Sequence, residues 1–173
     1  MIELSYTIDT RATAETQQFI AKVLSKEISC RGYNGPVGFI KFSVNGHNMN
    51  WCGESDEDEL LPFALGLNTI LHSIKVGEEI RDRMSDSGLS LYYKLIDAET
   101  ILLAPSPSIE RAEILCDFND LKLKAESFCL ALYNDIMRLF PGFFEAWELG
   151  TDGIRNEQGE TQSEEIIRKL HLK

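Results

Sequence analysis

The sequence has no apolar run long enough to cross a bilayer. Its longest apolar stretches, such as residues 101–104, cover only a few positions, whereas a transmembrane helix needs about 20. The first nine residues also lack the positively charged start and the apolar stretch of a signal peptide, and they read as a strand instead. We therefore expect a cytoplasmic protein that has no membrane partner.

The sequence is poor in basic residues. It has 17 Lys and Arg against 28 Asp and Glu, which gives a net charge of -11 over 173 residues. Such a charge repels the phosphate backbones of nucleic acids and anionic lipid surfaces. Nucleic acid is therefore excluded as a direct partner, and a basic protein is favoured, because complementary potentials speed encounter and suppress wrong partners.

The sequence also lacks the local motifs of metal and phosphate chemistry. It contains no glycine-rich phosphate loop, no Gly-x-Ser-x-Gly and no Cys-x-x-Cys. Its cysteines and histidines are scattered singly, so we expect reduced thiols, no metal site and no cofactor. These residues are Cys30, Cys52, Cys116, Cys129, His47, His72 and His171.

Two periodicities alternate along the chain and predict its elements. Period-two alternation predicts strands over residues 3–8, 37–44, 47–52, 89–95, 100–104 and 113–118. Helical spacing predicts helices from Thr13 to Gly32, from the acidic residues before Leu60 to Ile74, from about Asn119 to Leu139, and from Ser163 after a polar loop at 150–162. Asn45-Gly46 between two strands predicts a hairpin. The order of elements predicts one α+β domain, residues 1–173, whose mostly antiparallel sheet is covered by helices on one side.

Five carboxylates occupy six consecutive positions ahead of the second helix. They are Glu54, Asp56, Glu57, Asp58 and Glu59. A calcium loop would need a glycine that is absent here. One interpretation is a solvated helix start, which Ser55 caps while Asp58 takes the capping-box position. The other is a docking surface for Lys and Arg side chains. We weigh the two equally.

Aromatic residues form the second group of candidate contacts. The segment from Phe140 to Trp147 contains four aromatics, and Trp51 lies in the second strand of the Asn45-Gly46 hairpin. Exposed aromatics are typical anchors of protein interfaces. Aromatics that follow a helix end also commonly close over the core, and we favour that interpretation for this segment. Trp51, Phe143 and Trp147 are kept as candidate partner contacts.

Part of the chain resembles the middle of small bacterial immunity proteins, which accompany polymorphic or contact-dependent growth inhibition toxins. The resemblance rests on the helix Glu59-Leu-Leu-Pro-Phe-Ala-Leu-Gly-Leu-Asn-Thr-Ile-Leu71 and on the hairpin Leu91-Tyr-Tyr-Lys-Leu-Ile-Asp-Ala-Glu-Thr-Ile-Leu-Leu103. The Gly-x-Tyr-x-Trp element that such proteins often carry is missing, since the region reads Gly88-Leu-Ser-Leu-Tyr-Tyr93. The resemblance implies a cytoplasmic, non-enzymatic protein that binds one cognate toxin domain, in many cases a basic nuclease.

Three hypotheses of function remain open. The leading one is an immunity or inhibitor protein whose acidic surface docks a basic toxin domain. The second is a small enzyme that uses a carboxylate or His72 as acid or base, which requires a concave pocket and a displaced pKa. The third is a structural adaptor, which predicts a large exposed apolar patch and self-association.

Overall fold

The computed structural model describes residues 1–29, 35–49, 58–84, 89–106, 113–150, 159–160 and 168. Over these residues the chain forms two antiparallel sheets and four α-helices, which confirms the α+β class. The strands are β1 (Ile2–Ile8), β2 (Val37–Val44), β3 (His47–Asn48), β4 (Asp58–Glu59), β5 (Glu79–Met84), β6 (Leu89–Leu95), β7 (Thr100–Ser106) and β8 (Ile114–Asp117). The helices are α1 (Thr13–Leu24), α2 (Leu60–Ser73), α3 (Phe118–Leu139) and α4 (Phe143–Gly150), with a 3-10 turn, Thr10–Ala12, before α1.

The first sheet is built on the long antiparallel pair of β1 and β2. Their register runs from Ile2 opposite Val44 to Ile8 opposite Gly38, and β3 and β4 both pair with β2. The turn after β2 has φ of 52° at Asn45 and 82° at Gly46, which is the left-handed geometry that tight hairpins need, so the predicted hairpin is confirmed. Its second strand, β3, has two residues only.

The start of the second helix differs from the prediction. The main chain of Asp58 and Glu59 pairs with Gly38 and Val37 of β2, so it is extended there, and α2 begins only at Leu60. The side chain of Glu59, at the N-cap, makes no cap hydrogen bond. The capping-box interpretation of Asp58 is therefore wrong. Pro62 lies in the first turn of α2, where its missing N–H costs nothing.

The second sheet has the strand order β5-β6-β7-β8, all antiparallel. The predicted hairpin of β6 and β7 and the predicted strand β8 are confirmed. Strand β5 was not predicted. Its sequence, Glu-Ile-Arg-Asp-Arg-Met, carries too few apolar residues to show alternation, and pairing along β6 holds it in the sheet.

The helices also differ from the predictions at their ends. Helix α1 ends at Leu24 rather than near Gly32, and Lys26 takes a left-handed φ of 61° shortly after. Helix α3 starts at Phe118, capped by the Asp117 side chain, which accepts a 2.7 Å hydrogen bond from the Asp120 N–H. Helix α4 was not predicted, and the helix predicted from Ser163 lies outside the described residues.

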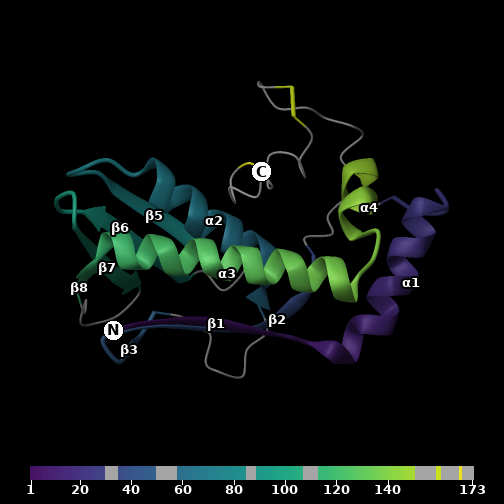
Figure 1. Ribbon diagram of the computed structural model, residues 1–173, viewed down its shortest axis with the longest axis horizontal. Helices are drawn as coiled ribbons and strands as arrows, with labels where there is room; N and C mark the ends of the chain where they lie inside the picture. Colours follow the sequence, from purple (N-terminus) through teal and green to yellow (C-terminus); the bar gives the residue numbers. More distant parts are fainter. Residues whose placement is uncertain are drawn as a thin grey trace.

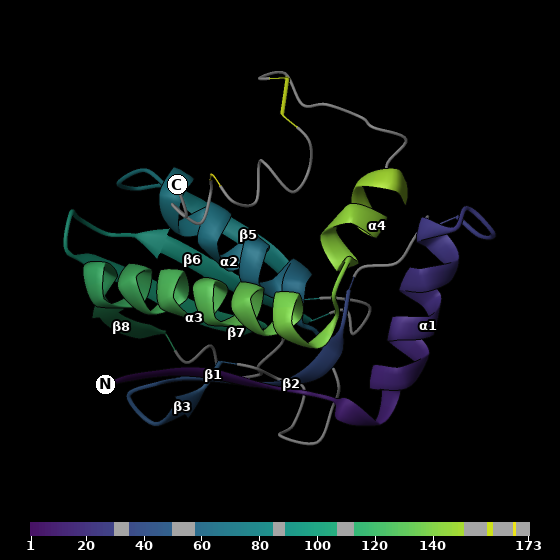
Figure 2. The ribbon, with the colours of Figure 1, turned by 45° about the vertical axis from the view of Figure 1, so that its right-hand side comes forward.

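One continuous hydrophobic core joins the inner faces of both sheets to the helices. Helix α3 runs along the length of the molecule in front of α2, with β1 and β2 below it (Figure 1). Strands β5 to β8 lie at one end and α1 and α4 at the other, in Figure 2 as well. Among the described residues, no helix combines the length and the apolar character that a membrane span requires.

Candidate protein-binding surface

The second sheet has one buried face and one open face. Along β6, the side chains of Leu91, Tyr93 and Leu95 are buried in the core, so the alternate side chains point outward. The cross-strand register continues this outer face onto β7 and β8, where it aligns Leu102 with Leu115. We call the outward apolar group the outer sheet face; its members are Tyr92, Ile96, Leu102, Ala104 and Leu115.

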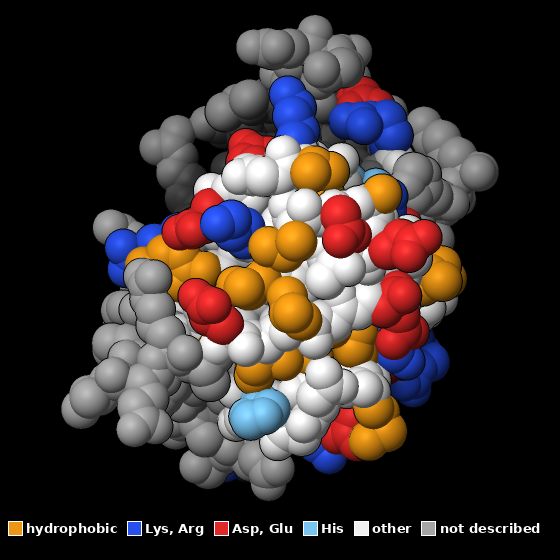
Figure 3. All heavy atoms as spheres, turned by 90° about the vertical axis from the view of Figure 1, so that its left-hand side faces the viewer, with side chains coloured by type: hydrophobic (Ala, Val, Ile, Leu, Met, Phe, Trp, Pro, Cys, Tyr) orange, Lys and Arg blue, Asp and Glu red, His pale blue; other side chains and the backbone are white. Residues whose placement is uncertain are grey.

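The outer sheet face is partly open to solvent: Ile96 and Leu115 are exposed, Tyr92 and Leu102 are half-buried, and Ala104 is buried. Leu115 is 54% exposed and Ile96 41% exposed. Figure 3 shows apolar side chains gathered near the middle of this end of the molecule, with acidic and basic side chains around them. Large exposed apolar groups within a charged rim are typical of protein-binding surfaces.

A shallow depression of about 110 Å³ lies within the outer sheet face. Its apolar lining comes from Tyr92, Ile96, Leu102 and Ala104, and the acidic residues Glu79 and Glu113 also line it, as does Lys94. The depression therefore combines an apolar floor with carboxylates.

The ring of Tyr92 is backed by a neighbouring cation. The guanidinium of Arg81 lies 5.4 Å from the centre of that ring, and its Nε donates a 2.9 Å hydrogen bond to the Ser90 hydroxyl. Arg81 is thus engaged within the sheet. The contact holds one wall of the depression in place.

Further carboxylates cluster at the adjoining corner, where the β6–β7 turn meets the start of α3. The Asp97 carboxylate accepts 2.8 Å hydrogen bonds from the backbone N–H groups of Glu99 and Thr100. These bonds, the one from Glu99 foremost, lower the pKa of Asp97 below its usual value. The Glu99 carbonyl in turn accepts from the Phe118 N–H at 2.7 Å, and this ties the turn to α3. Asp97, Glu99 and Asp117 therefore extend the acidic rim.

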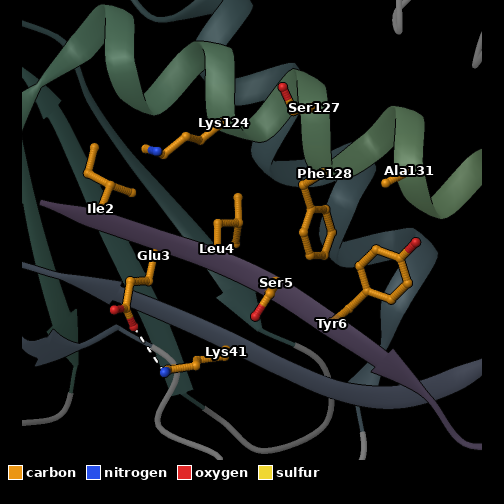
Figure 4. Close-up of a pocket in the computed structure, with 10 residues that line it drawn as sticks. All are labelled: Ile2, Glu3, Leu4, Ser5, Tyr6, Lys41, Lys124, Ser127, Phe128 and Ala131. Carbon is orange, nitrogen blue, oxygen red and sulfur yellow. Dashed lines mark ion pairs between the residues drawn. The ribbon is translucent and has the colours of Figure 1, made fainter.

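A second hollow, of about 650 Å³, runs between β1 and α3. Figure 4 shows Ile2, Leu4 and Tyr6 of β1 facing Lys124 and Phe128 of α3 across it. These apolar and aromatic side chains form its floor and one wall. The hollow is therefore a groove along an edge strand and a helix.

Polar groups at this groove form an ion pair and a hydrogen bond with one another. Glu3 forms a 3.0 Å ion pair with Lys41, and the Tyr6 hydroxyl donates a 2.7 Å hydrogen bond to Asp135. Burial raises the pKa of Tyr6, and its bond to Asp135 raises it further, so the phenol stays protonated and acts as a donor. Hydrogen bonds from Arg138 and from Tyr6 lower the pKa of Asp135. The hydrogen bond from Tyr6 to Asp135 joins β1 to α3.

His72 also has a structural partner. Its Nε2 lies 3.0 Å from the Glu126 carboxylate, which links α2 to α3. The one carboxylate whose pKa is raised by burial is, among the described residues, Asp82 of β5. It points to the inner side of its sheet, toward Gly66 of α2.

The structure describes only some of the predicted contact residues. Trp51, Glu54, Asp56 and Glu57 lie outside the described residues, whereas Asp58 and Glu59 belong to β4 in the first sheet. Phe143 is only 1% exposed, and its ring centre lies 5.6 Å from that of the half-buried Trp147. The core interpretation therefore holds for Phe143, which is not accessible to a partner. Sequence reasoning missed the outer sheet face, although the period-two pattern of β6 and β7 contained its residues.

Searches for related proteins gave no match: no family model, no curated protein and no solved structure is similar to this chain.

Proposed function

We propose that this protein is an inhibitor of the immunity type, which binds a basic toxin domain on the outer sheet face and blocks it. The observation that carries the proposal is the small depression on the outer sheet face, where Tyr92, Leu102 and Ala104 lie beside the charged residues Glu79, Glu113 and Lys94. The function is binding rather than catalysis, and the bound partner is a folded cytoplasmic protein domain.

The chemistry of the depression fits an Arg or Lys side chain. The aliphatic stem of such a side chain packs on apolar groups while its charged head stays at carboxylates. Leu102 and Ala104 supply apolar contacts, and Glu79 and Glu113 supply the carboxylates, with Lys94 facing Glu79 across β5 and β6. Arginine is enriched among the residues that dominate binding energy at interfaces. The depression therefore suits a single basic anchor from the partner.

The apolar residues around the depression supply the rest of the contact. Leu115 and Ile96 stand exposed beside it and would be removed from water by a partner. Burying apolar surface contributes about 25 cal/mol per Å². The contact is then apolar at its centre and charged at its rim, as protein interfaces usually are.

The charge of the whole chain favours the same partner. A net charge of -11 steers a basic domain toward the protein over long distances. The acidic run from Glu54 to Glu59 adds to this field. An acidic inhibitor also presents a field like that of a nucleic-acid substrate, which suits the inhibition of a basic nuclease.

Affinity capture from lysate of the source cells, with matched bait variants, tests the proposal. The first variant, Glu79→Lys with Glu113→Lys, reverses the carboxylates of the depression. The control, Glu15→Lys with Glu145→Lys, makes the same change of charge on α1 and α4, at the opposite end of the molecule (Figure 1). We expect the parent and the control to retain one basic protein that the first variant loses.

The activity of the captured protein completes the test. We expect its toxicity or nuclease activity to be blocked by the parent and by the control, and to survive addition of the depression variant. A captured protein that binds all three baits equally would place the interface elsewhere, and failure to inhibit it would overturn the inhibitor function.

A further inference from the structure

The solvent side of α3 carries three large apolar residues spaced seven apart. Leu123 is 62% exposed, Leu130 40% and Met137 47%. A spacing of seven residues keeps side chains in one line along a helix. Figures 1 and 2 show α3 at the front of the molecule, with no other helix or strand in front of it. The stripe is therefore an uncovered apolar line about 20 Å long.

Polar residues complete a heptad pattern on the same side. Ser127 and Asn134 fall between the apolar positions, so the spacing along the stripe is four, three, four, three. This is the alternation of the two seam positions of a coiled coil. A polar residue at a seam position fixes the register of paired helices, because only one alignment satisfies it. The face thus has the pattern of a helix that packs on another helix.

Charged residues beside the stripe face residues of opposite charge when a second copy of α3 packs antiparallel to the first. Toward its N-terminus α3 carries Asp120 followed by Lys124, and toward its C-terminus Asp135 followed by Arg138. In an antiparallel copy centred on Leu130, Asp120 comes within two positions of Arg138 of the second chain and Lys124 within one position of its Asp135, while Lys124 also comes within two positions of its Arg138. Each acid is also paired with the base on its own helix. Opposite charges then meet at both ends of the contact.

The same alignment matches the apolar and polar seam residues. Leu123 lies seven positions before Leu130 and Met137 seven after it, so each Leu123 meets Met137 of the second chain. Ser127 and Asn134 meet in the same way, and each Leu130 meets its own copy. An antiparallel arrangement also brings opposite ends of the helix dipoles together.

The groove beside α3 provides room for this packing. Ser127 and Ala131 line the groove on the α3 side, and both side chains are small and exposed. Small residues let a neighbouring helix approach closely, and the side chains that project from it fill the space beside them. The stripe and the groove are therefore parts of one surface.

We propose that this surface binds a second copy of the chain, with α3 packed antiparallel on α3 about a twofold axis through Leu130. The contact uses one 22-residue helix from each copy, which is small for a stable interface. The binding surface of the dimer is separate from the outer sheet face and does not depend on the inhibitor function.

Sedimentation equilibrium over a range of protein concentrations tests the dimer. Leu130→Glu places two carboxylates against each other at the twofold axis, and we expect the dissociation constant to rise by about 100-fold. The control, Val76→Glu, makes a similar change at another exposed residue, 63% exposed, in the turn after α2. It leaves the dissociation constant unchanged. Circular dichroism establishes that both variants are folded.

A charge exchange tests the alignment with exposed residues alone. Asp120→Arg puts a cation opposite Arg138 of the second chain and weakens the dimer by about 10-fold. Adding Arg138→Asp restores an opposite pair at both ends and recovers the affinity of the parent. A parent that stays monomeric, a dimer that Leu130→Glu leaves intact, or a double variant weaker than the single one would overturn the proposal.

Discussion

The outer sheet face and the exposed side of α3 expose apolar side chains to a similar extent but differ in their charges. Leu115 on the sheet is 54% exposed, and Leu123 on the helix 62%. On the sheet face, Glu79, Glu113 and Asp117 lie around the apolar centre together with the cations Arg81 and Lys94. The helix instead alternates acid and base along its length.

This difference assigns each surface its partner. Under the proposed function, a basic domain binds at the carboxylates of the outer sheet face, Glu79, Glu113 and Asp117. The helix face attracts its own reversed copy, because each end carries both signs. Apolar exposure alone marks a binding surface, and the charge pattern around it determines what binds there.

The largest expected effects are seen when each variant is tested for both associations, with the basic partner and with the second copy. Glu79→Lys with Glu113→Lys should weaken binding of the basic partner by about 100-fold and leave the dimer intact. Leu130→Glu should do the reverse. Titration calorimetry and sedimentation equilibrium on the same four preparations, the fourth being the combined variant, measure both constants. If one variant weakened both associations, the basic partner and the second copy would share a single binding surface.

Ionic strength should separate the surfaces next. Raising the salt from about 50 to about 500 mM screens the acidic rim and the long-range field, and should slow association of the basic partner by about 10-fold. The dimer has an apolar seam and should change by less than about 3-fold. Stopped-flow association and sedimentation at each salt concentration give the comparison. Equal salt dependence would contradict the assignment of partners.

Tyr6→Phe should have a smaller effect, on stability. It removes the hydrogen bond to Asp135 and should cost about 1 kcal/mol, which lowers the Tm by about 3 °C. Because the bonds to Asp135 lower its pKa, their contribution is present at neutral pH and is lost as the pH falls through that pKa. Thermal unfolding of parent and variant should therefore differ most at neutral pH. A constant difference down to pH about 2 would contradict this contact.

The smallest effect is expected at Asp82. Burial raises its pKa above the usual 3.8, so the cost of burying its charge grows as the pH rises through the folded pKa, and is absent below 3.8. Asp82→Asn should raise the Tm at neutral pH by at most about 2 °C. The control is the Tm measured at a pH below the usual pKa of aspartate, where parent and variant should have the same Tm. A variant that is less stable at neutral pH would show that the charge is stabilised by its surroundings.

Local patterns were sufficient to predict most of the framework. The Asn45-Gly46 turn, the β6–β7 hairpin and the core stripes of α2 and α3 follow from turn chemistry and periodicity. The predicted start of α2 was wrong because Asp58 and Glu59 pair with β2, which is distant in the sequence. This pairing overrides the local preference for a helix start. Strand β5 was missed for the same reason, since its partner β6 holds it in place.

The candidate surfaces were harder to predict because exposure depends on tertiary packing. The seven-residue spacing of Leu123, Leu130 and Met137 is visible in the sequence, yet a second apolar stripe on α3 is the one that enters the core. In the sequence, Leu102 and Leu115 are indistinguishable from buried strand residues. The register of β7 and β8 is what places them side by side on the open face. Phe143 shows the converse, since an aromatic that fits an interface is buried.

The mass of the complex between this protein and the proposed basic partner tests most directly the claim that the chain carries two separate binding surfaces. Light scattering coupled to size exclusion, at concentrations where the free protein is dimeric, should give two copies of each chain. The Leu130→Glu variant should give one copy of each. A parent complex with one copy of each would show that the partner displaces the second copy, and that a single surface serves both.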